Sequence, residues 1–410
     1  MFIGLHHRPL ISDEREYDSL AYSLASTATY SYEGASTAYR PVGYPAIVGS
    51  LYYVIGHPPV AVKCFQAVLD VGTAFLLFLL LAGHSDRIRV LAAGLWALYI
   101  PAILYSNLLM SETASAFFLT LTAYLICRKT DGRTATLTSI GICLGILVLI
   151  KPGILILPVL LCFFLPRIGI PFKRLYPAGI AFLLVLAPWI ARNYILFDRF
   201  ALSSNGGINL LIGNNPHTTG AYGITFDPEI LRDAKGEFDA DRQAFQWASR
   251  YIAGHPGEFA INAVKKLGRL LESEGGLLVL TFHGNPEDST THYVSKYASI
   301  PLLLTLLTNL SYFIVLILGV VGFLASRRDS IWWFTLSLAC SWILVHIVYF
   351  GGGRFHFPLM PFAAVFAALC LGGGSEVIKN LPRLEKIIGA VVIVILASLW
   401  IYEGVIIFNG

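Results

Sequence analysis

Residues 135–170 read ATLTSIGICLGILVLIKPGILILPVLLCFFLPRIGI, and Lys151 and Arg167 are the only charged side chains among them. A bilayer needs about 20 apolar residues for each crossing helix, so this run is long enough to enter a membrane. Pro152 removes a backbone N–H donor near its middle. The stretch is therefore either one long kinked helix or two spans that form a hairpin.

Basic residues on both sides of the stretch favour the hairpin. Loops on the cytoplasmic side of a membrane carry an excess of Lys and Arg. The loop before the run contains Arg128, Lys129 and Arg133, and the loop after it contains Arg167, Lys173 and Arg174. Both loops then belong on one side of the membrane. The sequence predicts two crossings, with the hairpin tip at Lys151-Pro152-Gly153.

The composition of the whole chain indicates a membrane protein. Of 410 residues, 56% are hydrophobic and 13% are charged, and the mean hydropathy is +0.68. We therefore predict an all-α polytopic membrane protein. About ten spans are expected, at residues 61–82, 89–106, 108–127, 135–150, 153–170, 176–195, 300–325, 331–350, 355–373 and 386–408. The net charge of +4 is too small to indicate nucleic-acid binding, and the six cysteines show no CxxC spacing typical of a metal site.

The same charge rule orients the other loops. Basic residues at 87–89, 327–328 and 379–386 fall in loops that alternate onto the cytoplasmic side. Every chemically unusual motif then lies on the opposite, extracytoplasmic face. We expect an extracytoplasmic first loop with juxtamembrane helices at 1–60, transmembrane helices at 61–195, an extracytoplasmic loop with an interfacial helix at 196–299, and C-terminal transmembrane helices at 300–410.

The segment 196–299 is the only substantial polar part of the chain. Its first half is rich in Gly, Asn and Asp, which favours turns. From about residue 238 to residue 274 the pattern becomes helical, with one apolar and one basic face. Such a pattern is typical of a helix that lies on the membrane surface.

The polar opening of the chain contains the first candidate acids. Residues 13–29 carry a helical stripe of apolar side chains, and Ser12 is a candidate N-cap. Asp13 and Glu14 then fall in the first helical turn. Two interpretations are open: the acids complement the helix dipole, or one of them is a general base that takes a proton from an acceptor hydroxyl or amine.

Candidate cations and one further acid occur at the predicted extracytoplasmic ends of other segments. Each has a structural interpretation, because Arg and Lys anchor helices at the headgroup level and an acid one turn inside a helix reaches water. Each also has a functional one, because a guanidinium fork grips phosphate and an acid within a span is costly without a role. These residues are Arg40, Glu112, Lys151, Arg192 and Arg354. His356 follows Arg354 closely and could bind phosphate with it, or could ligate a metal together with Glu33 or Glu112.

The order of these motifs resembles bacterial membrane glycosyltransferases of the GT-C superfamily, in the group of protein O-mannosyltransferases and lipid A aminoarabinose transferases. The resemblance covers most of residues 13–370. It is carried by Asp13-x-x-x-Tyr17, Tyr-Arg-Pro-x-Gly-Tyr-Pro at 39–45, Ser111-Glu112, Pro-Trp-x-x-Arg-Asn at 188–193, Asn-Gly-Gly-Ile-Asn-Leu at 205–210 and Gly-Arg-Phe-His-Phe-Pro-Leu-Met-Pro at 353–361.

The resemblance implies an inverting transfer of a sugar from a polyprenyl-phosphate donor on the extracytoplasmic face of the bacterial inner membrane. It implies Asp13 as the general base, with Glu14 as the second acid of the pair. It implies substrate-binding roles at matching motif positions and leaves a divalent metal open, because some relatives use one. The expected substrate-binding residues are Tyr17, Arg40, Tyr44, Glu112, Lys151, Arg192, Arg354 and His356.

Two other functions compete with a glycosyltransferase. One is a transporter or flippase for lipid-linked sugars, although the charges crowd at one face and no internal repeat is visible. The other is an inactive binding protein, because relatives begin with a transmembrane helix and only twelve residues precede Asp13. That difference predicts a chain that lacks the first helix or an internal start. The acceptor is expected to be a lipid, a glycan or a protein.

Overall fold

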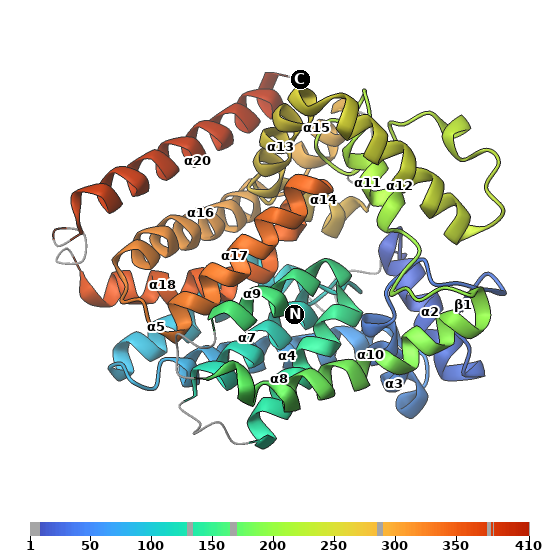
Figure 1. Cartoon of the computed structure of the whole chain (residues 1–410). Helices are drawn as coiled ribbons and strands as arrows, with labels where there is room; N and C mark the ends of the chain where they lie inside the picture. The colour runs from blue at the N-terminus through green and yellow to red at the C-terminus, as the bar shows by residue number, and fades with distance from the viewer. Residues whose placement is uncertain are drawn as a thin grey trace.

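The computed structural model describes residues 9–128, 134–164, 170–284, 290–374, 379 and 381–409. Lys129, Arg133 and Arg167, on which part of the loop-charge argument rests, lie outside these residues. The described chain is built almost entirely of helices (Figure 1). Its one sheet within these ranges pairs Ser31–Tyr32 (β1) antiparallel with Ala35–Ser36 (β2). The predicted all-α class is confirmed.

The helices have a simple order along the chain. The N-terminal half contains α2 (Asp13–Thr27), α3 (Gly43–Ile55), α4 (Pro59–Leu80), α5 (Asp86–Ala97), α6 (Ile100–Tyr105), α7 (Glu112–Cys127), α8 (Thr134–Ile150), η1 (Pro152–Leu155), α9 (Ile156–Phe164), η3 (Phe172–Arg174) and α10 (Tyr176–Phe197). The C-terminal half contains α11 (Gly206–Gly213), η4 (Pro228–Leu231), α12 (Glu237–Gly254), α13 (Pro256–Leu270), α14 (Gly275–His283), α15 (Thr290–Ala298), α16 (Leu302–Ala325), α17 (Ser330–Val348), η5 (Gly353–Leu359), α18 (Met360–Gly373) and α20 (Arg383–Asn409).

Six helical segments in the described residues are long and apolar enough to cross a bilayer. They are α4, α10, α16, α17, η5 continued by α18, and α20. Of the shorter apolar segments, α3 precedes α4, and α7, α8 and η1–α9 lie between α4 and α10 in sequence. This arrangement confirms a polytopic membrane protein.

Two predicted helix boundaries need comment. The expected span at 89–106 is wrong as a single helix, because α5 ends at Ala97 and α6 begins at Ile100. Tyr99 is extended between them, and Pro101 in the first turn of α6 has no N–H to continue the helix. The break inside 135–170 is confirmed, because α8 ends at Ile150 and Lys151 is extended before η1.

The predicted first helix is confirmed as α2, with Asp13 and Glu14 in its first turn. Ser12 is the N-cap residue of α2, as expected, but its side chain makes no capping hydrogen bond. Ser12 has a backbone φ of 46°, whereas an N-cap residue normally adopts the extended conformation that directs its hydroxyl to the first-turn N–H groups. The acids of this turn are nevertheless placed to complement the helix dipole.

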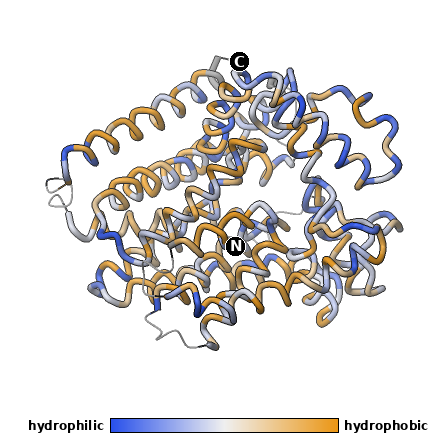
Figure 2. Tube along the Cα trace, in the orientation of Figure 1, coloured by the Kyte–Doolittle hydropathy of each residue, from blue (hydrophilic) through white to orange (hydrophobic). Residues whose placement is uncertain are grey.

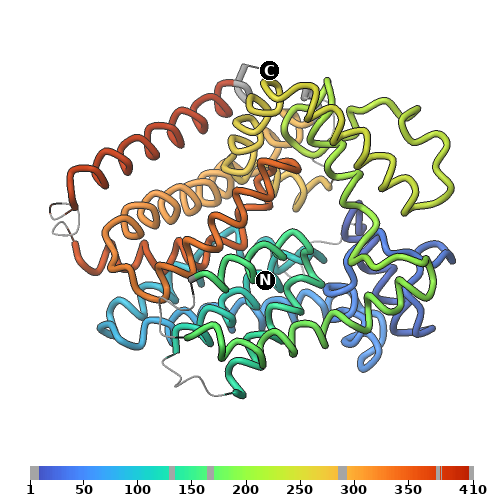
Figure 3. The backbone as a smooth tube through the Cα atoms, in the orientation of Figure 1, coloured from blue at the N-terminus to red at the C-terminus, as the bar shows by residue number. Residues whose placement is uncertain are grey.

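Polar segments gather at one end of the apolar helices. Figure 2 shows the long helices as largely hydrophobic and the segments near α2, α11 and α12 as more hydrophilic. Figure 3 shows the blue N-terminal segment and the yellow-green segment after α10 meeting at this end. Hydrogen bonds join them, because Ala38 N donates to Glu237 Oε1 at 2.7 Å and Ser204 N donates to Ala38 O at 3.0 Å. The first loop and the long polar loop therefore form one polar end.

Part of the Gly-rich stretch after α10, where the sequence favours turns over a packed strand, forms the helix α11. Gly207 N and Ile208 N, at the start of α11, donate to Asp241 Oδ1 of α12 at 2.6 and 3.1 Å. This side chain satisfies N–H groups that the helix itself leaves without partners. Downstream, the expected helical pattern from 238 to 274 is confirmed as α12 and α13, which are separated at His255.

A close backbone contact seats α11 against the end of α17. A Cβ added to Gly213 would lie 1.5 Å from Tyr349 O, whereas one added to Gly206 would meet no atom within 4 Å. We expect Gly213→Ala to destabilise the protein by about 1–3 kcal/mol, as overpacked positions do. Gly206→Ala, in the same helix, is the matched control, and its free energy of unfolding should lie within about 1 kcal/mol of the parent's. Thermal unfolding in detergent measures both; equal melting would contradict the contact.

The orientation of the membrane helices is a prediction that cysteine labelling can test. Asp233 is exposed in the predicted external loop, and Ser85 is exposed in a predicted cytoplasmic loop. In a background without the six native cysteines, a membrane-impermeant maleimide added to intact cells should label Asp233→Cys and spare Ser85→Cys. Ser204 also lies in the external loop but is buried, which makes it a poor reporter. The reverse labelling pattern would invert the topology.

Candidate functional site

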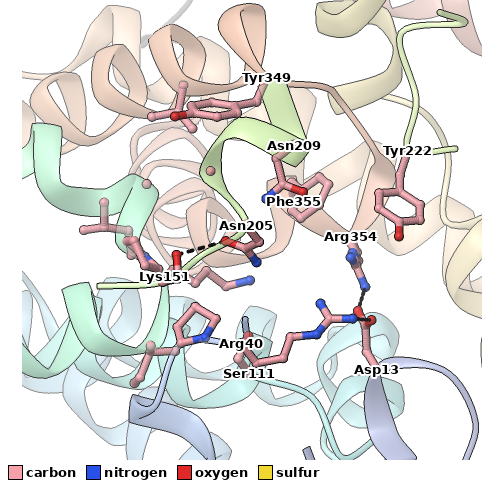
Figure 4. Close-up of a pocket in the computed structure, with 18 of the residues that line it drawn as sticks. Asp13, Arg40, Ser111, Lys151, Asn205, Asn209, Tyr222, Tyr349, Arg354 and Phe355 are labelled. Atoms are coloured by element: carbon pink, nitrogen blue, oxygen red, sulfur yellow. Dashed lines mark hydrogen bonds and ion pairs between the residues drawn. The ribbon is translucent and has the colours of Figure 1, made fainter. Parts of the chain in front are cut away.

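A cavity of about 290 Å³ opens at the polar end of the helices. Residues from seven regions of the sequence line it: the start of α2, the segment 39–41, the α6–α7 turn, the α8–η1 junction, the start of α11, Tyr222 between α11 and η4, and the segment from α17 to η5. Figure 4 shows Asp13, Arg40, Lys151 and Arg354 around this space. Six predicted site residues are lining residues: Asp13, Tyr17, Arg40, Glu112, Lys151 and Arg354.

Asp13 lies between two arginines that come from opposite ends of the chain. Its Oδ1 accepts from Arg40 Nη2 at 2.6 Å, and its Oδ2 accepts from Arg354 Nη1 at 2.5 Å (Figure 4). Arg40 Nε also donates to Glu16 Oε2 at 2.5 Å. All four side chains are less than one third exposed. Both oxygens of Asp13 therefore have cationic partners.

This arrangement controls the protonation of Asp13. Burial raises the pKa of its carboxyl, but Arg354 and Arg40 together outweigh burial and hold that pKa well below the usual range. Asp13 is therefore ionised at neutral pH. Burial also raises the pKa of the neighbouring Tyr17 to about 12, so its phenol stays neutral.

A second ion pair lies in the same cavity. Lys151 Nζ donates to Glu112 Oε1 at 2.9 Å, and the side chain of Glu112 is only 3% exposed. Glu112 Oε2 has no hydrogen-bond partner among the described residues. A buried oxygen without a partner is costly, so this atom is a candidate acceptor for a ligand hydroxyl or amine.

The rest of the lining is polar on one side and aromatic on another. Ser203, Asn205 and Asn209 line it from the start of α11, and Ser203 Oγ hydrogen-bonds Asn205 Oδ1 at 2.9 Å. Large apolar and aromatic surface comes from Tyr39, Tyr222, Trp342, Tyr349, Phe350 and Phe355. None of these was predicted as a site residue. The Asn-Gly-Gly-Ile-Asn motif was the available signal for Asn205 and Asn209.

Glu14 and Tyr44 are buried outside the lining and support the turn that leads to Glu112. Glu14 Oε1 accepts from Leu109 N at 3.1 Å. Tyr44 donates to Gln66 Oε1 at 2.8 Å, and the Gln66 amide donates to two carbonyls of the same turn. The structure therefore places these predicted site residues behind the cavity.

Arg192 and His356 also lie outside the lining. Arg192 donates to Thr37 O at 2.8 Å and to Tyr30 O at 3.0 Å, which ties the β1–β2 hairpin to α10. His356 is 2% exposed and faces Glu274 Oε1 at 3.0 Å. Their side chains contact protein groups here, so neither is positioned in the cavity as a phosphate ligand.

The open metal question can be examined from the arrangement of ligands. Within the described residues, no group of three or more His, Cys, Asp or Glu side chains has metal-binding geometry. His356 faces Glu274 instead of Glu33 or Glu112. Each carboxylate in the cavity already has a cationic partner. The donor set of the described residues does not fit a divalent metal.

The solved structures that are similar to this chain include two of one protein. One is ArnT from Cupriavidus metallidurans bound to undecaprenyl phosphate, with 14% identity over 90% of this chain and 75% of that chain and a TM-score of 0.45. The other is ArnT from the same organism in the apo state, with 13% identity over 91% and 74% and a TM-score of 0.42. No protein-family profile and no curated protein matches the chain. The cavity is therefore the feature from which the function is inferred.

Proposed function

We propose that this protein is a membrane glycosyltransferase that moves a sugar, with inversion, from a polyprenyl-phosphate donor to an extracytoplasmic acceptor in the bacterial inner membrane. The observation that carries the proposal is the pair of arginines on one carboxylate, inside an aromatic-walled cavity at the polar end of apolar helices. A lipid phosphate would reach such a cavity with its chain among the apolar helices.

The two arginines are the proposed phosphate site. A guanidinium presents several N–H donors in a planar fork that suits phosphate oxygens, and it keeps its charge when buried. In the structure, Arg40 and Arg354 share one small anion, Asp13. A donor phosphate would take over these contacts, and the same contacts would stabilise the phosphate as it leaves the sugar.

This exchange of partners would also prepare Asp13 to act as a base. While both arginines contact it, the pKa of Asp13 is held low and the carboxylate is a weak base. When phosphate draws the arginines away, burial remains and raises that pKa. Asp13 would then take the acceptor's proton as the acceptor oxygen or nitrogen attacks the anomeric carbon. The bond from that carbon to the phosphate oxygen breaks, and the polyprenyl phosphate leaves.

Glu112 is the alternative base. Its Oε1 is held by Lys151 and its Oε2 is buried without a partner among the described residues. In the leading assignment, Glu112 instead accepts a hydroxyl of the sugar or acceptor, and Asn205 and Asn209 supply further neutral contacts to sugar hydroxyls. Glu14 supports the turn before Glu112 and takes no proton.

Reconstitution into proteoliposomes tests the proposal. Purified protein should bind undecaprenyl phosphate and should release it from some member of a panel of undecaprenyl-phosphate sugars when an envelope extract supplies acceptors. A product with inverted anomeric configuration is expected. If the protein neither binds the lipid phosphate nor releases it, the proposal is wrong. If it moves fluorescent lipid-linked sugar across the bilayer without cleaving it, the flippase alternative replaces the proposal.

A further inference from the structure

A buried polar pair lies directly behind Arg354 and is not part of the cavity. His356 is 2% exposed and Glu274 is 1% exposed, and the imidazole Nε2 lies 3.0 Å from Glu274 Oε1. The other ring nitrogen, Nδ1, donates to Leu270 O at 3.0 Å. The imidazole also stacks on Tyr312, with ring centroids 4.3 Å apart. These contacts leave His356 one orientation.

The pair belongs to a set of anchors that hold the short helix η5. Gly353 N donates to Glu272 Oε1 at 2.9 Å, one residue before Arg354. Phe355 O accepts from Trp342 Nε1 at 2.6 Å, one residue after it. His356, which follows Phe355, adds the third anchor through its own hydrogen bonds. Arg354 is therefore flanked by anchored residues on both sides.

The anchors connect Arg354 to the polar loop. Leu270 ends α13, and Glu272 and Glu274 lie in the link between α13 and α14. Glu274 N in turn donates to Asn309 Oδ1 at 3.0 Å, and Tyr99 donates to Glu274 Oε1 at 3.2 Å. The link is thus fixed to α16 and to the α5–α6 junction as well as to η5.

Burying such a pair is a poor way to gain stability. Removing charged and polar groups from water costs several kcal/mol, and the attraction between them often only compensates for that loss. Glu274 Oε2 even lacks a hydrogen-bond partner among the described residues. A well-packed apolar pair would serve packing alone. The benefit of the polar pair is a defined geometry for the residues attached to it.

We propose that His356 and Glu274 are positioning residues that hold Arg354 at the donor phosphate. The part of this inference that concerns phosphate rests on the proposed function, and the part that concerns Arg354 and Asp13 does not. His356 acts through Arg354 and touches neither the donor nor the acceptor.

A double-variant cycle tests the phosphate part. His356→Phe keeps a ring against Tyr312 and removes both hydrogen bonds. We expect it to weaken binding of undecaprenyl phosphate in nanodiscs about tenfold, because one guanidinium contact is no longer aligned. In an Arg354→Ala background the same change should have no further effect. Equal weakening in both backgrounds would show that His356 acts elsewhere and would overturn the inference.

A measurement without lipid phosphate tests the positioning itself. The stabilising coupling between Asp13 and Arg354 is obtained from the unfolding of Asp13→Asn, Arg354→Ala and the double variant. This coupling should be lost in the His356→Phe background, and its survival there would overturn the inference. Tyr312→Phe is the control, because it loses only the hydrogen bond to Leu271 O and should leave the coupling intact. If the parent fails to bind the lipid phosphate, the proposed function fails while this cycle still decides the positioning.

Discussion

Asp13→Asn is expected to lower the rate of sugar transfer about a thousandfold, in the range that loss of a general base produces. The amide cannot take the acceptor's proton. Binding of undecaprenyl phosphate should stay the same or tighten, because Asn no longer competes with phosphate for Arg40 and Arg354. Single-turnover rates and lipid-phosphate titrations on the same preparation measure the two effects separately. A base and a structural acid differ in this split between rate and affinity.

Two further carboxylates make that experiment decisive. Asp18 lies one turn further along α2, where Tyr52 and His57 contact it, and it does not line the cavity. Asp18→Asn is therefore the matched control and should keep the parent rate within about threefold. Glu112→Gln should reduce the rate less than Asp13→Asn and should weaken substrate binding. If Asp13→Asn transfers sugar at the parent rate and Glu112→Gln does not, the base is Glu112.

Six of the residues expected at the site line one cavity, and most of them occur at or near the ends of separate helical segments, where the polar end of the molecule is formed. Lys151 and Glu112 show what a topology prediction can place and what it cannot. A charge-based topology puts both on one face, and the structure brings them to 2.9 Å. The topology could not say that they pair with each other, because that depends on how α7 and the α8–η1 junction pack.

Arg192 and His356 show the limit of the same reasoning. An arginine at the end of an apolar helix has the same sequence pattern whether it faces a ligand or caps neighbouring carbonyls. Arg192 contacts carbonyls of the β1–β2 hairpin, about 155 residues earlier in the chain. The partner of His356 is Glu274, 82 residues away. Only the folded chain shows these contacts, since no local pattern encodes them.

The helix α11 gives a third case, in which a distant side chain overrides local preference. The Gly, Asn and Asp content of this segment predicts turns, and two adjacent glycines also weaken a helix. Asp241 accepts from both N–H groups at the start of the segment and lies about 34 residues later. The resulting helix presents Asn205 and Asn209 to the cavity. When the structure of a motif depends on such a distant contact, the sequence reveals the motif but does not predict its conformation or its position in the fold.

Replacing both arginines is expected to abolish donor binding, with a loss of a hundredfold or more in the affinity for undecaprenyl phosphate. Each single change to Ala should cost about tenfold, since each removes one fork of charge-assisted hydrogen bonds. Arg40→Lys and Arg354→Lys should recover only part of the loss, because an ammonium keeps the charge without the planar fork. Titration of the lipid phosphate into nanodiscs measures all of these variants.

Arginines outside the cavity supply the controls for that series. Arg199 is exposed and donates to the adjacent Asp198 O, so Arg199→Ala should bind the lipid phosphate like the parent. Arg192→Ala loses the contacts to the β1–β2 hairpin and should melt at a lower temperature, yet it should keep its affinity at temperatures where it is folded. If Arg192→Ala loses affinity and the Arg40 and Arg354 variants keep it, the phosphate binds at α10. The exchange of partners proposed for Asp13 would then be wrong, because its arginines would never leave it.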